Sequence, residues 1–449
     1  MRTLGALFIV AALSMVASPA AAGLPADPGA PGPYAVGHAS FTIVDPGRDP
    51  ESPFNGRPVF VSIWYPVDKW NVTPDTPGAV YPLDPFYNRW PLSYSHDWEQ
   101  FGLAPAYESV PPSSDGPFPL VLASAGFGTR YFGFMFYGLR LASHGFVVAL
   151  AQHYHDAYQN DLDLAAYNTP TLIDAAMANR PPDMMLMLDA VLARNNTASE
   201  PLYNTVRPDL VAAMGHSLGG YAAMVLAGGD DLICGSPDDP LADTCIPARS
   251  TLPDGRVKAI VPLDGSSQLL HFAELARITI PTMAIGEAWG SQMQDWQARQ
   301  HAAISGSPSY RADILNTVHA SFGGNCAAAR VLAFYHVITA AQLNKNLSAP
   351  QCSSALPQLE VNRLAAKYAI AFLKTYLAGE SGFQPILTPG WALTRERDVE
   401  FFVTEKRMDG GFDDDWPDDF WYFTHQPGTE RARALREPST PLKIERVEP

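Results

Sequence analysis

Residues 210–226 read LVAAMGHSLGGYAAMVL, an apolar run, a glycine-flanked serine and a second apolar run. The central pentapeptide has the form Gly-x-Ser-x-Gly, with Ser217 in the middle. A strand, this turn and a helix form the context in which a serine is pushed out of a tight turn as a nucleophile. Side chains at the two glycines would collide with the strand or the helix. The stretch therefore predicts an α/β fold and makes Ser217 the first candidate catalytic residue.

Short apolar runs and helical patterns alternate on both sides of this turn. Runs typical of strands lie at residues 39–44, 58–65, 118–123, 146–151, 257–263, 282–285 and 310–315. Helical spacing appears at residues 134–143, 183–192 and 360–377. Short, fully apolar strands that alternate with helices indicate a parallel sheet covered on both faces. We expect a doubly wound, mostly parallel sheet, with residues 67–116 forming an aromatic loop region that either lies near a binding cleft or is an irregular surface excursion.

A serine hydroxyl needs a histidine to accept its proton and a carboxylate to orient that histidine. In this fold class the three residues follow the chain order serine, acid, histidine. His319 comes after Ser217 and follows the predicted strand 310–315 by a short turn, which would present it at the carboxyl edge of the sheet. The later histidines His271, His301 and His336 fall in segments of helical character. His319 is therefore the expected base.

Two residues compete for the role of the acid. Asp264 directly ends the predicted strand 257–263, and Glu287 follows the predicted strand 282–285. Both stand at carboxyl ends of strands, where catalytic groups gather in open α/β sheets. The pattern alone does not decide between them.

The oxyanion that forms in acyl transfer needs preorganised hydrogen-bond donors. In this fold class one donor is the amide after the nucleophile, here Leu218, and the other lies in a loop after an earlier strand. The glycine-rich turn at residues 125–128 follows the predicted strand 118–123, and the amide of Phe127 is the expected second donor.

A possible metal pair is the His-x-His of His153 and His155, which follows the predicted strand 146–151. No third ligand with suitable spacing accompanies it, so we expect these rings to line the cleft or bond within the loop. The sequence predicts no metal and no cofactor.

The N-terminus indicates export. Residues 1–22 have a basic start, an apolar core and a terminal Ala-Ala-Ala, which predicts a signal peptide cleaved before Gly23 and a secreted or periplasmic protein. No later apolar segment is long enough to span a membrane. An oxidising destination favours disulfide bonds, and we favour the pairs 234–245 and 326–352 because each brackets a loop-like stretch rich in Pro, Ser and Asp.

Charge and length limit the remaining classes. The net charge of −16 argues against nucleic acid or an anionic membrane as a partner. The 449 residues suit one α/β domain with insertions or two domains. We expect a catalytic domain over residues 23–385, with an insert at 229–256, and a C-terminal extension at 386–449 to which the sequence assigns no role. The oligomeric state is not indicated.

The chain resembles the α/β-hydrolase superfamily, and more narrowly its branch of platelet-activating factor acetylhydrolases and predicted dienelactone hydrolases. The resemblance covers about residues 35–380. It is carried by FPLVLASAGFG at 118–128, LASHGFVVALAQH at 141–153, RPPDMMLMLDAVL at 180–192 and GHSLGG at 215–220.

This resemblance implies a serine esterase without a cofactor, in which Asp264 rather than Glu287 is the acid and His319 is the base. Ser124 and Ala125 stand where relatives usually show a Ser-His-Gly turn. The insert and the extension are longer than the common core requires, which implies a remodelled substrate pocket.

Together these observations predict a secreted serine carboxylic ester hydrolase that forms an acyl-enzyme and acts on short-acyl or small esters. A short-acyl phospholipid, a polyester and a small aryl ester all suit an aromatic-rich cleft. The alternatives are a lactonase, polyester hydrolase or peptidase of the same fold, or a non-catalytic binding protein, because fold alone does not establish activity.

Overall fold

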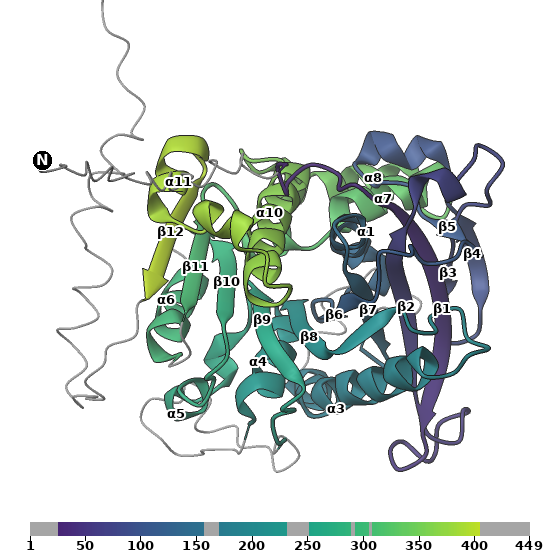
Figure 1. Cartoon of the computed structure of the whole chain (residues 1–449), viewed down its shortest axis with the longest axis horizontal. Coiled ribbons are helices and arrows are strands. Elements are labelled where there is room, and N and C mark those ends of the chain that lie inside the picture. Colours follow the sequence, from purple (N-terminus) through teal and green to yellow (C-terminus); the bar gives the residue numbers. More distant parts are fainter. Residues whose placement is uncertain (1–25, 157–169, 231–250, 289–291, 305–307, 405–449) are drawn as a thin grey trace, which may run out of the picture.

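The computed structural model describes residues 26–156, 170–230, 251–288, 292–304 and 308–404. A ten-stranded sheet with the order β12-β11-β10-β9-β8-β6-β7-β2-β1-β5 runs through this part of the chain (Figure 1). Its strands are β1 (Ala35–Asp45), β2 (Arg57–Val67), β5 (Tyr107–Glu108), β6 (Phe118–Ser124), β7 (Val147–His153), β8 (Val206–His216), β9 (Val257–Leu263), β10 (Thr282–Glu287), β11 (Ser309–Ile314) and β12 (Val399–Thr404).

The centre of the sheet is parallel and its sides are partly antiparallel. Strands β7, β6, β8, β9, β10 and β11 pair in parallel. Strand β2 runs antiparallel to both β1 and β7, and β12 runs antiparallel to β11. The six parallel strands therefore end at one common edge, where β8, β9 and β11 deliver the loops that hold the candidate site.

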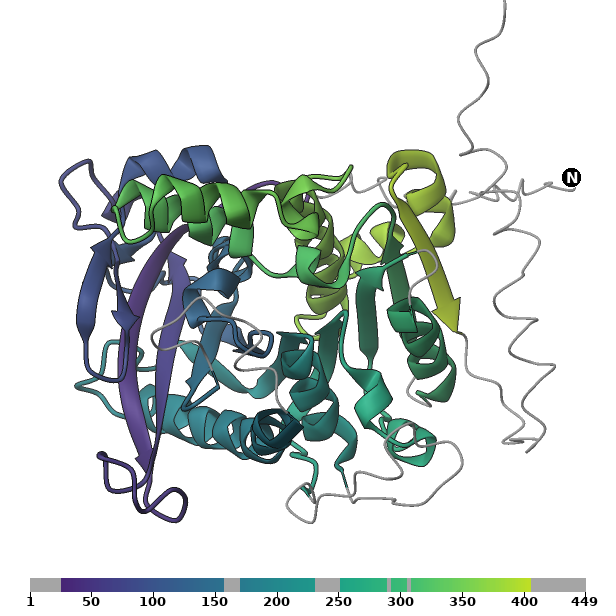
Figure 2. The ribbon, with the colours of Figure 1, turned by 180° about the vertical axis from the view of Figure 1, so that it is seen from behind.

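Helices cover both faces of the sheet (Figures 1 and 2). They are α1 (Met135–Ser143), α3 (Pro170–Asn195), α4 (Leu218–Gly228), α5 (Phe272–Leu275), α6 (Gln292–Ala303), α7 (Asn325–Phe334), α8 (Ala340–Leu347), α9 (Pro350–Ser353), α10 (Gln358–Tyr376) and α11 (Pro389–Arg395). Helices α1 and α10 share one apolar core with one face of the sheet, and α3 and α4 share a second core with the other face.

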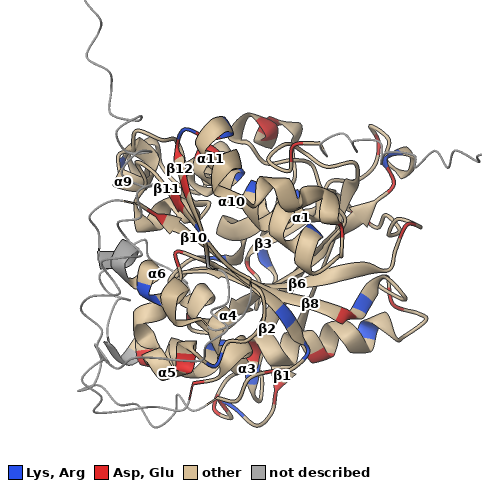
Figure 3. Cartoon of the chain, turned by 60° about the vertical axis from the view of Figure 1, so that its left-hand side comes forward, with Lys and Arg blue, Asp and Glu red and all other residues tan. Residues whose placement is uncertain are grey.

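The apolar runs explain why these elements form. All seven residues of β7 are buried, as expected for a strand packed on both faces. Helix α10 buries Val361, Leu364, Tyr368 and Phe372, which recur at helical spacing on one face. In Figure 3 the ribbon positions of Lys, Arg, Asp and Glu lie mostly on helices, loops and the outer strands of the sheet. The predicted doubly wound, mostly parallel α/β sheet is confirmed.

Three segments differ from the sequence-based expectation. Residues 67–116 contain a two-stranded sheet of β3 (Val80–Asp84) and β4 (Arg89–Ser93), so they are not only loop. Helix α3 starts well before residue 183, although Pro181 and Pro182 lie inside it. Strand β12 belongs to the segment assigned to an extension after residue 385, yet it completes the edge of the main sheet. The alternating apolar residues Val399, Phe401 and Val403 are typical of a strand, and the predicted domain boundary did not take them into account.

One disulfide bond joins Cys326 and Cys352, with their Cα atoms 5.7 Å apart, as predicted. Cys234 and Cys245, with most of the insert, lie outside the described residues, as do the predicted signal peptide at 1–22 and residues 405–449. Among the helices that the structure describes, none is both long and apolar enough to cross a membrane.

Candidate active site

Ser217 occupies the sharp turn between β8 and α4. Its φ of 56° and ψ of −122° are unusual for a residue with a side chain and are typical of strain at functional sites. The turn is also tightly packed. A Cβ on Gly215 would lie 2.3 Å from the Gly219 carbonyl carbon, and a Cβ on Gly219 would lie 2.0 Å from the Ser124 carbonyl oxygen. The glycines of the pentapeptide are therefore required by close backbone approach.

A hydrogen-bonded chain joins the three predicted triad residues. The Ser217 hydroxyl lies 2.9 Å from Nε2 of His319, and Nδ1 of His319 lies 2.6 Å from Oδ2 of Asp264. Ser217 comes from the turn after β8, Asp264 from the end of β9, and His319 from the loop after β11. This arrangement lets the ring accept the serine proton while the carboxylate stabilises the imidazolium that results.

Asp264 is fully buried, and both of its oxygens are used. Oδ2 accepts from His319, whereas Oδ1 accepts from the Gln297 amide at 2.6 Å and from the Glu287 backbone N–H at 3.3 Å. The competing candidate Glu287 thus lies beside the acid and bonds to it through its main chain. The structure places the Asp264 carboxylate, rather than that of Glu287, on the His319 ring.

The charge of this pocket favours proton uptake by His319. Burial lowers the pKa of His319, but the hydrogen bond to Asp264 and the negative charges of Asp264 and Glu287 outweigh burial and raise that pKa above its ordinary value. Neighbouring His216 behaves in the opposite way, because burial and the charge of His319 lower the pKa of His216 to about 3. Neutral His216 donates from Nε2 to the His319 carbonyl at 2.8 Å and so holds the loop that carries His319.

The two predicted oxyanion donors come from backbone segments close to Ser217. Leu218 is the first residue of α4, so its N–H has no acceptor within the helix. A Cβ on Gly126 would lie 3.5 Å from Cβ of Ser217, which places the backbone next to Phe127 against the nucleophile. Within the described part of the chain, neither the Phe127 N–H nor the Leu218 N–H donates a hydrogen bond. Both therefore stay candidates for donors at an oxyanion site.

The backbone fold of this chain is similar to that of solved structures. The structure of a ferulic acid esterase from Streptomyces cinnamoneus matches with a TM-score of 0.52 over 77% of this chain and 91% of that chain, at 18% sequence identity. The chain has the α/β-hydrolase fold. Its sequence matches no protein-family model and no curated protein. The shared fold explains why the turn at Ser217 and the loops of Asp264 and His319 meet at one edge of the sheet.

The other histidines considered in the sequence analysis lie elsewhere in this α/β-hydrolase fold. His153 is hydrogen bonded to Ser124 and Asp183, and the ring of His155 packs on Tyr154. His301 is buried in α6, and His271 precedes α5. Across the described ranges, no group of three or more His, Cys, Asp or Glu side chains could hold a metal ion.

The sequence reasoning missed Gln297 and His216 as parts of the site. Gln297 sits on α6 within a polar helix, where nothing in the local pattern marks it as the partner of a carboxylate. His216 carried a signal, because it immediately precedes the nucleophile at the end of a buried strand and was read only as a variable position of the pentapeptide.

Proposed function

We propose that the chain is a secreted serine hydrolase of carboxylic esters, acting on short-acyl or small esters through an acyl-enzyme. The observation that carries the proposal is the hydrogen-bonded chain from Ser217 through His319 to Asp264, built on a strained turn. The leader at residues 1–22 and the Cys326–Cys352 bond support an exported protein.

The reaction follows from these contacts. The Ser217 oxygen forms a bond to the ester carbonyl carbon while its proton moves to Nε2 of His319. The carbonyl oxygen becomes an oxyanion, which the Phe127 and Leu218 amides hold. The carbon–alkoxide bond then breaks, and His319 gives its proton to the leaving alkoxide. Water repeats the sequence on the acyl-enzyme, which releases the acid and restores the serine.

The chemistry of known similar proteins supports a small ester as substrate. One solved structure with a similar backbone fold is that of a ferulic acid esterase. The sequence resembles the platelet-activating factor acetylhydrolase and dienelactone hydrolase branch. The first likeness favours an aromatic acyl group, and the second favours a short acyl group. A lactonase, polyester hydrolase or peptidase would use the same side chains, and a binding-only protein would not turn over any of these substrates.

The first experiment compares Ser217→Ala with the wild type. We expect wild-type protein to hydrolyse p-nitrophenyl esters and to be labelled by a fluorophosphonate, and both signals to disappear in the variant. Ser114→Ala is a matched control, because Ser114 is exposed and contributes only its backbone N–H to a hydrogen bond. Unchanged turnover and labelling in Ser217→Ala would overturn the proposal.

A second experiment separates the reaction classes. A series of p-nitrophenyl esters of increasing acyl length, together with a matched lactone and anilide, is offered to wild-type protein. We expect the highest kcat/KM for short acyl chains and none for the anilide, since amides are poorer acyl donors. A higher kcat/KM for the lactone or the anilide would assign the chain to the lactonases or peptidases.

A further inference from the structure

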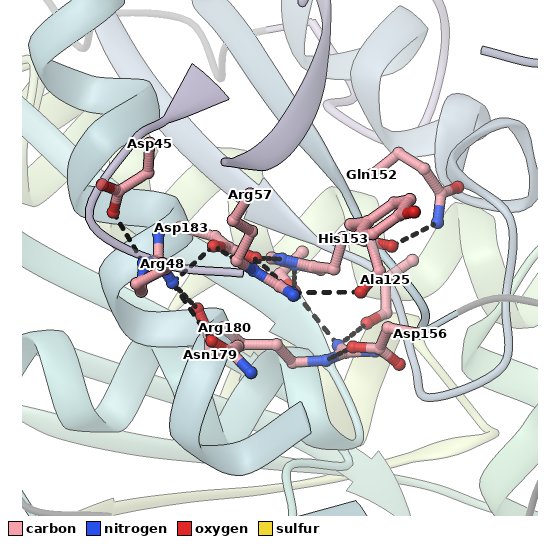
Figure 4. A network of polar contacts seen from close by, with 12 residues as sticks. Asp45, Arg48, Arg57, Ala125, Gln152, His153, Asp156, Asn179, Arg180 and Asp183 are labelled. Carbon is pink, nitrogen blue, oxygen red and sulfur yellow. Dashed lines mark hydrogen bonds and ion pairs between the residues drawn. The ribbon is translucent and has the colours of Figure 1, made fainter. Parts of the chain in front are cut away.

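A second series of hydrogen-bonded serine, histidine and aspartate side chains lies beneath the candidate site. The Ser124 hydroxyl is 2.9 Å from Nε2 of His153, whose Nδ1 is 2.9 Å from Oδ2 of Asp183. Ser124 and Asp183 are fully buried and His153 is 3% exposed, so no substrate reaches this serine. Arg57 donates to Asp183 at 2.9 Å and neutralises its charge (Figure 4).

The hydrogen bonds of this buried chain all run in one direction. Burial lowers the pKa of His153 and keeps the ring neutral, so Nδ1–H donates to Asp183 and Nε2 accepts from the Ser124 hydroxyl. The Ser124 oxygen in turn accepts from Nη1 of Arg180 at 3.2 Å. This series of hydrogen bonds therefore begins at the guanidinium of Arg180, which comes from α3 and points toward the loop after β6.

Arg180 connects the hydrogen bonds of Ser124, His153 and Asp183 to the loop that carries Phe127. Its Nη1 also donates to the Ala125 carbonyl, and its Nε and Nη2 form a fork with the Asp156 carboxylate at 2.5 and 2.9 Å (Figure 4). The Asp156 carbonyl accepts from the Gly128 N–H at 3.0 Å. Both ends of the loop 125–128 are therefore tied to the Arg180–Asp156 pair.

These contacts fix three successive peptide planes. Arg180 holds the carbonyl of the 125–126 peptide, and Asp156 holds the N–H of the 127–128 peptide. The intervening peptide donates to no described residue through the Phe127 N–H, and its Gly126 carbonyl accepts from the Thr129 N–H at 3.1 Å. In a planar trans peptide the N–H points opposite to the carbonyl. The Phe127 N–H is thereby kept on the side away from the Thr129 turn.

A role in stability alone explains this network poorly. A buried ion pair often contributes little net stability, because the desolvation of both charges offsets their attraction. An arginine is needed here because only a planar fork can serve a carboxylate, a hydroxyl and a carbonyl together. Resting on the function proposed above, we propose that Arg180 and Asp156 are positioning residues for catalysis, which orient the Phe127 amide toward the oxyanion.

The test uses Arg180→Lys and Asp156→Asn in the full chain. Lysine keeps the charge but loses the fork, so we expect kcat to fall about 10- to 100-fold with KM unchanged, because the amide acts only in the transition state. An aryl trifluoromethyl ketone, which adds to the serine as a tetrahedral oxyanion, should bind more weakly by the same factor. A merely structural defect would lower the active fraction without changing the affinity of this inhibitor.

Arg311→Lys is the control, because Arg311 forms a comparably buried pair with Asp313 at 2.8 Å on β11. It should lower the thermal midpoint and leave inhibitor affinity unchanged. Wild-type kcat and inhibitor affinity in folded Arg180→Lys and Asp156→Asn would overturn the inference. If one variant fails to fold, the other decides. If Ser217→Ala stays active, the proposed function itself fails. This outcome differs from wild-type behaviour of Arg180→Lys and Asp156→Asn, which would overturn only the positioning role.

Discussion

Gln297 donates a hydrogen bond from its side-chain amide to Oδ1 of Asp264 at 2.6 Å, on the opposite oxygen from the one that contacts His319. Gln297 is 1% exposed, so no water replaces it at that oxygen. The carboxylate is therefore held by a bond on each side, and its plane is fixed relative to the imidazole. The sharpest tests of the site follow from this contact.

We expect Gln297→Leu to lower both kcat and stability. The substitution leaves a buried carboxylate oxygen with one weaker donor, which costs about 1–3 kcal/mol, and lets Asp264 rotate away from His319. The matched control is Gln300→Leu on the same helix, since no described residue hydrogen bonds to its buried amide group. Gln300→Leu should be neutral or stabilising. Urea unfolding and ester turnover check both variants, and equal behaviour of the pair would contradict the assigned contact.

Asp264→Asn should lower kcat about 10⁴-fold with little change in KM, as loss of the orienting carboxylate does in such triads. Gln297 and the Glu287 N–H both donate to Oδ1, so the introduced amide oxygen will face them. Its NH₂ then faces Nδ1 of His319 and forces the tautomer that cannot accept the serine proton. Steady-state kinetics measure this effect, and a mild loss would argue against Asp264 as the acid.

Glu287→Gln should shift the pH dependence rather than abolish turnover. The negative charge of Glu287 is one of the causes that raise the pKa of His319, and the ring must be neutral to act as a base. Removal of that charge lowers the pKa, so the neutral ring persists to more acidic solution. The acid limb of the kcat/KM profile is expected to move to lower pH. A limb that stays in place, or a loss as large as that of Asp264→Asn, would contradict this role.

The sequence predicted which residues of the candidate site sit at strand ends. The turn at Ser217 and the short link from β11 to His319 are local, so chain order and the apolar runs were enough to find them. The choice between Asp264 and Glu287 was not local, because β9 and β10 are neighbours and both residues end up at the same edge. The resemblance favoured Asp264, and in the structure the His319 ring bonds to Asp264.

Long-range side-chain contacts could not be predicted. Gln297 reaches Asp264 from a helix 33 residues away, and Arg180 reaches Ala125 across 55 residues. Their partners depend on how α6 and α3 pack on the sheet, which periodicity does not specify. The prolines at 181 and 182 also concealed the true start of α3, because proline normally ends or kinks a helix.

The disulfide bond is expected to stabilise the region next to His319. Cys326 and Cys352 lie 26 residues apart, and closing a loop of that length reduces the entropy of the unfolded chain by an amount worth about 3.5 kcal/mol. The Cys326→Ala/Cys352→Ala variant should unfold at a lower urea concentration while keeping its kcat. Comparison with this variant is cleaner than reduction, which would also act on any bond between Cys234 and Cys245. An unchanged midpoint would show that the bond adds no stability.

Ser217→Gly should be inactive yet more stable than Ser217→Ala. The φ of 56° with ψ of −122° strains any residue that carries a Cβ, and such strain costs about 1–3 kcal/mol. Glycine removes this strain, but it also gives the unfolded chain about 0.4–1 kcal/mol of extra freedom. The net expected gain of Gly over Ala is about 1 kcal/mol, measured by urea unfolding. The introduced Ala keeps the same backbone demand without the hydroxyl, so the two inactive variants isolate the strain. Equal midpoints would mean that the turn stores no strain at the nucleophile.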